Sequence, residues 1–390
     1  MSCFLEEPAI VCALGNDPAT VRENLYAGRS PGMRWTEDFS PGRSILLGTA
    51  RVPAAEPELA LRHRSRNNQL LHAALAALRP RLDPVLAAVA PHRFAVVLGT
   101  STSGMAETEA AVAAHAARGA LPSGFHLGQQ ELGSPALYVA EELGVTGPAF
   151  TVSTACSSSA KAIASGARLL AGGLADAALV GGVDTLCRFT VAGFAALEAM
   201  SSARCNPFSR NRDGINIGEG AALFLMQREP GPVRLTGWGD ASDGYHVSAP
   251  DPHGSGARLA MQAALRRAGG RIGARLGYIN LHGTGTRQND AMESRVVHDL
   301  LNGIPASSTK PLTGHALGAA GAIEAALCWL VLTDPAGRLP PHLYDGDPDP
   351  ELPVLNLVAP GGRLAAAPAA VMTTSFAFGG SNVALVLERT

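Results

Sequence analysis

The stretch at residues 154–173, TACSSSAKAIASGARLLAGG, combines a polar turn, a cysteine and a helix of small residues. It follows the strand-like run AFTV, and the glycine pair at its end predicts where the helix stops. A second stretch at residues 313–332, TGHALGAAGAIEAALCWLVL, repeats this arrangement later in the chain. Because small side chains let helices approach closely, we expect the two helices to pack side by side at the centre, with both N-termini directed at one site. The repetition indicates an internal duplication.

Apolar runs rich in Val, Ile and Leu alternate with alanine-rich stretches along the chain, which is typical of an α/β fold with strands buried on both faces. The segment 228–233, REPGPV, is a charged and Gly/Pro-marked break, so we divide the chain into residues 1–232 and 233–390. The clearest predicted strands are at residues 94–98, 149–152, 177–180 and 278–281, with two more between 370 and 387 around a turn at 378–381.

The composition is that of a compact enzyme rather than of a disordered chain. Of 390 residues, 46% are hydrophobic and 16% are charged, and 44 are glycine. A net charge of −2, with no cluster of Lys and Arg interleaved with aromatic residues, excludes the usual signature of nucleic-acid binding.

Cysteine usage and the N-terminal sequence indicate a cytoplasmic protein. The six cysteines have no paired spacing, so neither a disulfide framework nor a zinc site of the CxxC kind is expected. The N-terminus carries acidic residues where a signal peptide needs basic ones. No membrane span is expected, because the longest apolar candidate, residues 319–332, is short and contains Glu324, and we interpret it as a buried helix.

Cys156 is the candidate nucleophile. It lies between a predicted strand and a predicted helix, where its sulfur would face the positive end of the helix dipole, a placement that favours the thiolate. Free cysteines are more often small buried hydrophobic residues, and this is our interpretation of Cys12, Cys187 and Cys328.

Two histidines follow in the second half. His282 ends the run YINLH and opens HGTGT, in which the hydroxyl groups of Thr284 and Thr286 can hydrogen-bond a ligand. A histidine at the end of a strand is as often an ordinary loop residue, so this motif needs support from other candidate residues. A second histidine, His315 in TKPLTGH, gives that support.

Lys310 and Glu324 flank His315 in almost wholly apolar sequence. A charged side chain in apolar surroundings is rarely tolerated alone, since its desolvation is expensive. We therefore predict that the two side chains interact and position the histidines.

The run SFAFGGSN places Gly379 and Gly380 directly after Phe378. Two glycines let the backbone approach a ligand and offer an N–H group to a developing oxyanion. An ordinary glycine hairpin turn is the competing interpretation.

Together, TACSSS, HGTGT, TKPLTGH with GAAGAIE, and SFAFGGSN resemble, in order and spacing, the elongating β-ketoacyl-carrier-protein synthases of the thiolase superfamily. The resemblance covers nearly the whole chain, including residues 213–222 and 242–254. It implies a duplicated thiolase-like fold with five layers, αβαβα, and association of two chains, as a homodimer or as a heterodimer with a related ketosynthase-like subunit.

The resemblance also implies roles for the candidate residues. Cys156 would take an acyl group from the phosphopantetheine arm of an acyl carrier protein, with the N–H groups of Cys156 and Phe378 as the oxyanion hole. His282 and His315 would stabilise the enolate that forms when a malonyl extender loses carbon dioxide, since two N–H donors on the thioester oxygen lower that barrier. No metal or redox cofactor is implied.

Further roles follow from the same resemblance. Lys310 and Glu324 would support the histidines, Thr284 and Thr286 would contact the pantetheine arm, and Phe378 would gate the acyl pocket. The sequence RQN at residues 287–289 replaces a stretch that usually contains Pro and Gly, and this departure allows a specialised polyketide or aryl-polyene pathway beside fatty-acid synthesis.

Other functions remain open on the sequence. A thiolase would need a second cysteine near the C-terminal glycines, and an initiating synthase would carry Asn in place of His315. A third alternative is a chain-length-factor-like partner subunit of a heterodimeric ketosynthase. Such subunits typically lack the nucleophile, whereas Cys156 is present.

Overall fold

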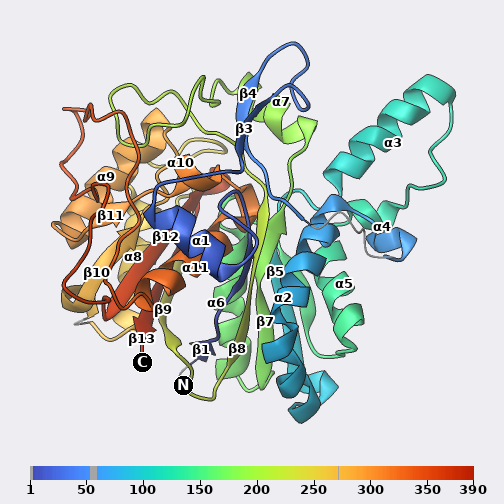
Figure 1. The fold of residues 1–390 in the computed structure, drawn as a ribbon, viewed down its shortest axis with the longest axis horizontal. Coiled ribbons are helices and arrows are strands. Elements are labelled where there is room, and N and C mark those ends of the chain that lie inside the picture. The colour runs from blue at the N-terminus through green and yellow to red at the C-terminus, as the bar shows by residue number, and fades with distance from the viewer. Residues whose placement is uncertain (1–2, 53–58, 271) are drawn as a thin grey trace.

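The computed structural model describes residues 3–52, 59–270 and 272–390. Its strands are β1 Cys3–Leu5, β2 Ala9–Val11, β3 Met33–Thr36, β4 Ile45–Gly48, β5 Phe94–Gly99, β6 Ala149–Val152, β7 Ala177–Asp184, β8 Gly220–Gln227, β9 Val233–Ser242, β10 Leu276–Asn280, β11 Ala306–Ser307, β12 Ala370–Ala377 and β13 Ser381–Arg389. All but the β3–β4 hairpin form one sheet of 11 strands through the centre of the molecule (Figure 1). The strand order is β11-β10-β12-β13-β9-β1-β8-β7-β5-β6, and β2 pairs with β8.

The two halves of this sheet repeat one pattern. In the first half, β5 is parallel to β6 and β7, and β7 is antiparallel to β8. In the second half, β10 is parallel to β11 and β12, and β12 is antiparallel to β13. The short strand β1 joins the halves, because Phe4 pairs with Gln227 of β8 and with Arg234 of β9. The repeated order supports the proposed division at the connection between β8 and β9, into residues 1–232 and 233–390.

Helices cover both faces of each half-sheet. They are α1 Pro18–Tyr26, α2 Arg66–Ala88, α3 Met105–Arg118, α4 Leu127–Gln130, α5 Ser134–Leu143, α6 Ser158–Ala171, α7 Arg188–Ala196, α8 Ser255–Arg267, α9 Arg287–Leu301, α10 Lys310–Thr313 and α11 Ala320–Leu332. In Figure 1, α2 and α5 lie outside the first half-sheet, α8 and α9 lie outside the second, and α6 and α11 lie between the two. The expected thiolase-like order αβαβα is therefore present, with one apolar core on each side of each half-sheet.

The two central helices pack as closely as their small residues allow. A Cβ atom added to Gly321 of α11 would lie 2.7 Å from Cβ of Ala160 in α6. The N–H group of Ala322 donates to Oγ of Ser159 at 2.8 Å. The prediction that these helices lie side by side is confirmed, and glycine at position 321 is required by this contact.

The predicted strands are confirmed, with differences at their ends. β6 has the predicted bounds, whereas β7 continues four residues further, to Asp184. This extension includes Gly182, where a Cβ atom would lie 2.5 Å from Cβ of Ser159, so glycine leaves room for the first turn of α6. β10 ends at Asn280, which places Leu281 and His282 in the following loop.

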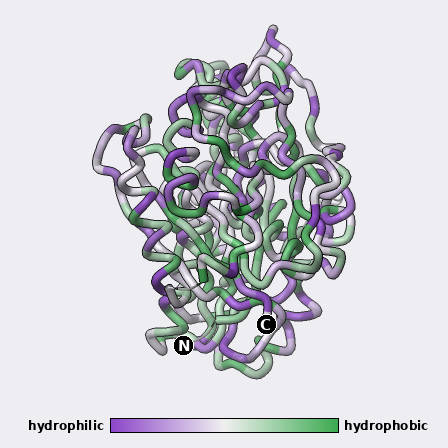
Figure 2. The backbone as a smooth tube through the Cα atoms, turned by 90° about the vertical axis from the view of Figure 1, so that its left-hand side faces the viewer, coloured by the Kyte–Doolittle hydropathy of each residue, from purple (hydrophilic) through white to green (hydrophobic). Residues whose placement is uncertain are grey.

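Hydrophobic stretches of the backbone concentrate in the interior, and many of the outer loops are hydrophilic (Figure 2). Both ends of the described chain lie beside β9, since Cys3 pairs with Leu235 and Arg389 pairs with Val233. Among the described residues, no helix is both long enough and apolar enough to cross a membrane. Helix α11, which corresponds to the buried helix predicted at residues 319–332, has all 13 residues buried.

Candidate active site

Cys156 lies in the tight turn between β6 and α6, with 6% of its surface exposed. The turn requires an unusual backbone, because Ala155 has a φ of 50°, in the left-handed region that residues other than glycine seldom adopt. Hydroxyl groups hold this backbone in place: Oγ of Ser158 accepts from the N–H group of Thr154 at 2.9 Å and donates to the carbonyl of Ala155 at 2.6 Å. The turn thus presents the thiol just before the N-terminus of α6.

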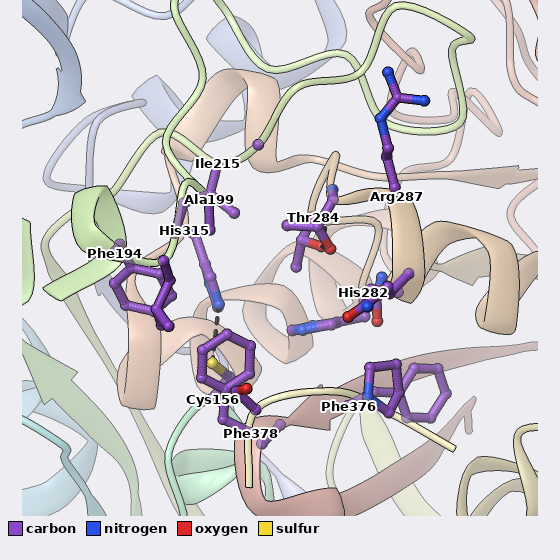
Figure 3. Close-up of a pocket in the computed structure, with 18 of the residues that line it drawn as sticks. Cys156, Phe194, Ala199, Ile215, His282, Thr284, Arg287, His315, Phe376 and Phe378 are labelled. Carbon is purple, nitrogen blue, oxygen red and sulfur yellow. Dashed lines mark hydrogen bonds between the residues drawn. The ribbon is translucent and has the colours of Figure 1, made fainter. Parts of the chain in front are cut away.

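The structure brings both histidines to this thiol from the other half of the chain (Figure 3). His282 follows β10, and His315 lies between α10 and the turn that precedes α11. Nε2 of His315 lies 3.0 Å from Sγ of Cys156. The rings of His282 and His315 meet edge to face, with their centroids 5.3 Å apart. One ring nitrogen of each histidine and the sulfur lie within 4.8 Å of one another.

Lys310 and Glu324 form a fully buried ion pair behind the histidines. Nζ of Lys310 lies 2.5 Å from Oε1 of Glu324, and the two side chains are 1% and 2% exposed. The same ammonium donates to the backbone carbonyl of His282 and lies 3.3 Å from its Nδ1. The pair predicted from the sequence is thus in contact, and it reaches His282 directly but not His315.

This contact determines the tautomer of His282. Burial lowers the pKa of His282 well below its usual value, and the charges of Lys310 and a protonated His315 act in the same direction, so the ring is neutral at pH 7. An ammonium only donates hydrogen bonds, so Nδ1 accepts and the ring proton lies on Nε2. Figure 3 shows the free edge of this ring directed into the cavity. His282 therefore offers an N–H donor to a ligand.

The thiol differs from the sequence-based expectation. Burial raises the pKa of Cys156 to about 12, although Lys310 and the residue's own backbone N–H group act to lower it. Burial, then Lys310, also lowers the pKa of His315 well below its usual value. Desolvation of the charged form outweighs the favourable end of α6 here. Burial thus acts against the thiolate that the start of the helix favours, and with pKa values shifted in these directions thiol and imidazole are both neutral at pH 7.

A cavity of about 460 Å³ opens in front of these groups. Phe378 lines one side of it, where its ring centroid is 5.5 Å from that of Phe194. Thr284 and Thr286 line another wall, with their hydroxyl oxygens 2.9 Å apart. Gly379 and Gly380 have φ values of 79° and 70°, which permit the sharp turn after Phe378. Lys310, Glu324 and these two glycines are not part of the cavity wall.

Several residues of the site were not singled out from the sequence. The cavity wall also includes Phe194, Ile215 and Phe376. In the sequence, the pattern around each of them is that of an ordinary core residue. Arg287, at the mouth, belongs to the departure noted at residues 287–289, and Figure 3 shows its side chain pointing away from the thiol.

Glu293 of α9 is a further buried residue that no local pattern indicates. Its carboxylate accepts hydrogen bonds from the N–H groups of His282 and Gly283, both at 2.7 Å. Burial raises the pKa of Glu293 to about 7, and the neighbouring Asp290 acts in the same direction. Glu293 therefore fixes the backbone of the loop that carries His282.

Cys156, His282 and His315 have the ligand types of a metal site. The ammonium of Lys310, 3.3 Å from Nδ1 of His282, opposes a divalent cation here. The arrangement is better suited to an anionic oxygen in the cavity, because the N–H donor of His282 is backed by the cation of Lys310.

Comparison with known proteins gives consistent matches. A family model described as the β-ketoacyl synthase N-terminal domain matches residues 67–230, and the model of the C-terminal domain matches residues 233–344. Among solved structures, one chain of the complex of a ketosynthase (ApeO) with its chain length factor (ApeC) from Xenorhabdus doucetiae superposes with a TM-score of 0.95. It is 44% identical, and the match covers 100% of this chain and 98% of that one.

Curated relatives extend the comparison. Over 263 residues the chain is 38% identical to 3-oxoacyl-[acyl-carrier-protein] synthase 2 of Rhizobium meliloti, a match that covers 62% of this chain and 61% of that protein. The chain thus spans less than two thirds of that relative. Over 387 residues it is 33% identical to the tetracenomycin polyketide synthase ketoacyl synthase alpha subunit of Streptomyces glaucescens, covering 90% of this chain and 88% of the relative.

Proposed function

Because the chain belongs to the β-ketoacyl synthase family, we propose that it is an acyltransferase that condenses an acyl group with malonyl-acyl carrier protein to give a 3-oxoacyl product. The observation that carries this proposal is the meeting of Sγ of Cys156 with the ring nitrogens of His282 and His315 in one cavity. A thiol beside two neutral imidazoles matches the needs of a decarboxylating Claisen condensation: a covalent acyl carrier and two donors for an enolate oxygen.

In the first step, Sγ of Cys156 attacks the thioester carbonyl of an acyl group carried on a phosphopantetheine arm. The new S–C bond forms as the pantetheine thiolate leaves, and the proton of the cysteine passes to that thiolate. We assign the oxyanion hole to the N–H groups of Cys156 and Phe378, and the ring of Phe378 acts as the gate of the acyl pocket.

In the second step, malonyl-carrier protein loses carbon dioxide. The electron pair of the breaking C–C bond becomes an enolate, whose oxygen is stabilised by the N–H groups of His282 and His315. Its carbon attacks the acyl-cysteine, the new C–C bond forms, and Cys156 leaves as a thiolate that takes up a proton. Lys310 and Glu324 position His282 and hold its proton on Nε2.

We assign the wall formed by Thr284 and Thr286 to the pantetheine arm, with the backbone of Gly379 and Gly380 beside the bound thioester. The substrates then bring their own carrier, and the residues of the site supply the remaining chemistry without a further cofactor. The partner in each cycle is an acyl carrier protein, and we place the reaction in the cytoplasm.

A second subunit is supported by unpartnered apolar surface in the first half. Strand β6 is the outermost strand of the sheet, and its Phe150 is 40% exposed. Helix α3 projects from the body (Figure 1), and its Val112 is 59% exposed. We propose that a copy of this chain or a related ketosynthase-like subunit pairs along β6. The full-length likeness to a chain of a ketosynthase–chain length factor complex favours the heterodimer. The likeness to a subunit of a polyketide synthase favours a polyketide or related pathway over fatty-acid synthesis.

The same likeness to a chain of that complex supports a second candidate function. In this alternative the chain is a chain-length-factor-like subunit that catalyses no reaction itself. One experiment separates the two functions. The protein, alone and with the related subunit, is incubated with an acyl-carrier protein, and its peptides are examined by mass spectrometry. We expect an acyl adduct on Cys156 and, after malonyl-carrier protein is added, a 3-oxoacyl product. A folded protein that forms no adduct with any acyl donor in either arm would be the partner subunit.

A further inference from the structure

The chain has two lysines among 31 basic residues, and both lie in the helical segments that frame the cavity. Lys310 has a place in the proposed mechanism, whereas Lys161 does not. Lys161 lies on α6, five residues beyond Cys156, and its Nζ donates a hydrogen bond to Oγ of Ser381 at 2.7 Å. Burial lowers its pKa, so this ammonium has lost part of its hydration and its hydrogen bond is correspondingly strong.

Ser381 continues the contact to the turn that carries Cys156. Oγ of Ser381 lies 3.0 Å from Oγ of Ser157, which in turn donates to the carbonyl of Thr154 at 2.8 Å. An ammonium can only donate, so Oγ of Ser381 accepts from Lys161, and the same oxygen also accepts from the hydroxyl of Ser157, whose one hydrogen is shared with the carbonyl of Thr154. A chain of hydrogen bonds therefore connects Lys161, Ser381 and Ser157, with Ser381 as the acceptor at its centre.

This chain ties together the two backbone segments to which we assign the oxyanion hole. Ser157 is the residue after Cys156, and Ser381 is three residues after Phe378. Among the hydrogen bonds of the described residues, those of Ser381 Oγ are the ones that join these segments. The turn after Phe378 is open on the side of Gly379, where a Cβ atom would meet nothing within 4 Å.

On its opposite side, the same turn is held by a different part of the chain. The N–H group of Gly379 donates to the carbonyl of Val247 at 2.8 Å, and that of Asp243 donates to the carbonyl of Gly380 at 2.8 Å. These bonds fix the turn to the segment after β9 but not to α6. The direct hydrogen bonds between this turn and α6 are those of Ser381.

We propose that Lys161 is a positioning residue, which acts through Ser381 and Ser157 to set the spacing between the N–H groups of Cys156 and Phe378. The proposal rests on the proposed function, because it assigns a role within the same acyl-transfer step. Lys161 and Ser381 are outside the cavity wall, so the effect passes through the backbone and not through contact with substrate. A lysine suits the position, since its ammonium is a compact donor on a flexible stem.

If Lys161 has this role, its loss should slow acyl transfer but not decarboxylation. An oxyanion hole stabilises the tetrahedral intermediate of acyl transfer, whereas the enolate of decarboxylation is assigned to His282 and His315. Removing one oxyanion donor outright slows catalysis by about 10²–10³-fold, so displacing one by loss of its anchor should slow it by about tenfold or somewhat more. Malonyl decarboxylation should be nearly unchanged.

The experiment compares Lys161→Met, Lys161→Arg, Ser381→Ala and the double variant Lys161→Met/Ser381→Ala in the full-length protein. The matched control is Arg168→Met, which removes a basic residue from the same helix where it pairs with Asp240 and not with Ser381. Three quantities are measured for each variant: the kcat and KM of Cys156 acylation, the rate of carbon dioxide release from malonyl-carrier protein, and the thermal unfolding midpoint.

We expect Lys161→Met to lower the kcat of acylation by about tenfold or more, with KM and decarboxylation each within about twofold of wild type. The double variant should be no slower than Lys161→Met, because both changes break one chain of hydrogen bonds. The kcat of acylation should fall less in Lys161→Arg than in Lys161→Met. Arg168→Met should retain wild-type acylation.

Equal losses in acylation and decarboxylation would overturn the proposal in favour of a general structural role, as would unchanged acylation in Lys161→Met. A loss as large in Arg168→Met would do the same. Failure of the wild-type protein itself to acylate would instead refute the proposed function, before any variant is compared.

Discussion

The turn and helix that carry Cys156 (the nucleophile unit, residues 153–171) and those that carry His315 (the histidine unit, residues 309–332) have similar sequences but different surroundings. Helix α6 of the nucleophile unit buries one side, and Lys161 and Arg168 on its other side stay partly accessible. Helix α11 of the histidine unit is enclosed on all sides. The only acid within α11, Glu324, is consequently paired with Lys310.

Under the proposed function, one local arrangement serves two kinds of chemistry. The nucleophile unit offers a single thiol and the backbone N–H groups of a helix start, which suit the transfer of an acyl group. The histidine unit brings a buried ion pair and N–H donors, which suit the stabilisation of a developing anion. Changes within one unit, or at the contact between the two, test this comparison.

The largest effect is expected for Cys156→Ala. Acylation should fall by at least about 10⁴-fold, the scale seen when a covalent nucleophile is removed, while carbon dioxide release from malonyl-carrier protein continues. Mass spectrometry of the acyl adduct and a radiolabelled carbon dioxide assay measure the two. Cys12→Ala, which removes a buried cysteine outside the cavity, is the control and should acylate normally. Persistence of an adduct in Cys156→Ala would move the nucleophile elsewhere.

Lys310→Met tests the ion pair of the histidine unit. The change leaves Glu324 buried without its partner, so the free energy of unfolding should fall by about 3–5 kcal/mol, and decarboxylation should fall with it. In Lys310→Met/Glu324→Leu the lone charge is gone, and stability should recover while decarboxylation stays low. Chemical denaturation and carbon dioxide release measure these quantities. Recovery of decarboxylation in the double variant would show that the pair has only a structural role.

The two histidines should differ, because only His315 contacts the thiol. His282→Ala should slow decarboxylation by about 10²-fold and leave acylation within a few-fold of wild type. His315→Ala should slow decarboxylation similarly and should also slow acylation, by a smaller factor. Single-turnover assays of each step measure the split. Indistinguishable profiles for the two variants would contradict this division.

Gly321→Ala tests the close contact between the two units. The added Cβ atom would lie 2.7 Å from Cβ and 3.0 Å from the backbone nitrogen of Ala160, so we expect a loss of about 1–3 kcal/mol in the free energy of unfolding. The control is Gly193→Ala in α7, where a Cβ atom meets nothing within 4 Å; there alanine should be neutral or stabilising by up to about 1 kcal/mol. Equal stability of both variants would contradict the packing of α6 on α11.

The smallest effect concerns the pH dependence of Cys156. Burial raises its pKa to about 12, so the thiolate is a minor species at neutral pH and its fraction grows about tenfold with each pH unit. The rate of alkylation by iodoacetamide should therefore keep rising from pH 7 to 9.5, whereas a cysteine of ordinary pKa, about 8.5, would level off. Peptide mass spectrometry isolates Cys156 from the other cysteines. A plateau below pH 8 would show a resting thiolate.

Much of this site is predictable from the sequence, for an identifiable reason. The strand, turn and helix around Cys156, the glycine pair after Phe378 and the two repeated units are local patterns, and their spacing along the chain carries the family resemblance. The pairing of Lys310 with Glu324 was also predictable, because two charges in apolar sequence need each other. The charge state of Cys156 could not be predicted in this way. The start of a helix favours a thiolate, whereas burial of the site favours the neutral thiol.

The sequence by itself thus determined the fold class, the duplicated plan and the candidates that we propose as the reactive groups. Only the tertiary structure decided how these groups meet: the contact between His315 and Cys156, the buried carboxylate of Glu293 beneath His282, and the hydrogen bonds from Lys161 through Ser381 to Ser157. Each joins segments far apart in the chain. Burial and distance across such contacts depend on how all the layers pack together, and no local pattern of residues encodes them.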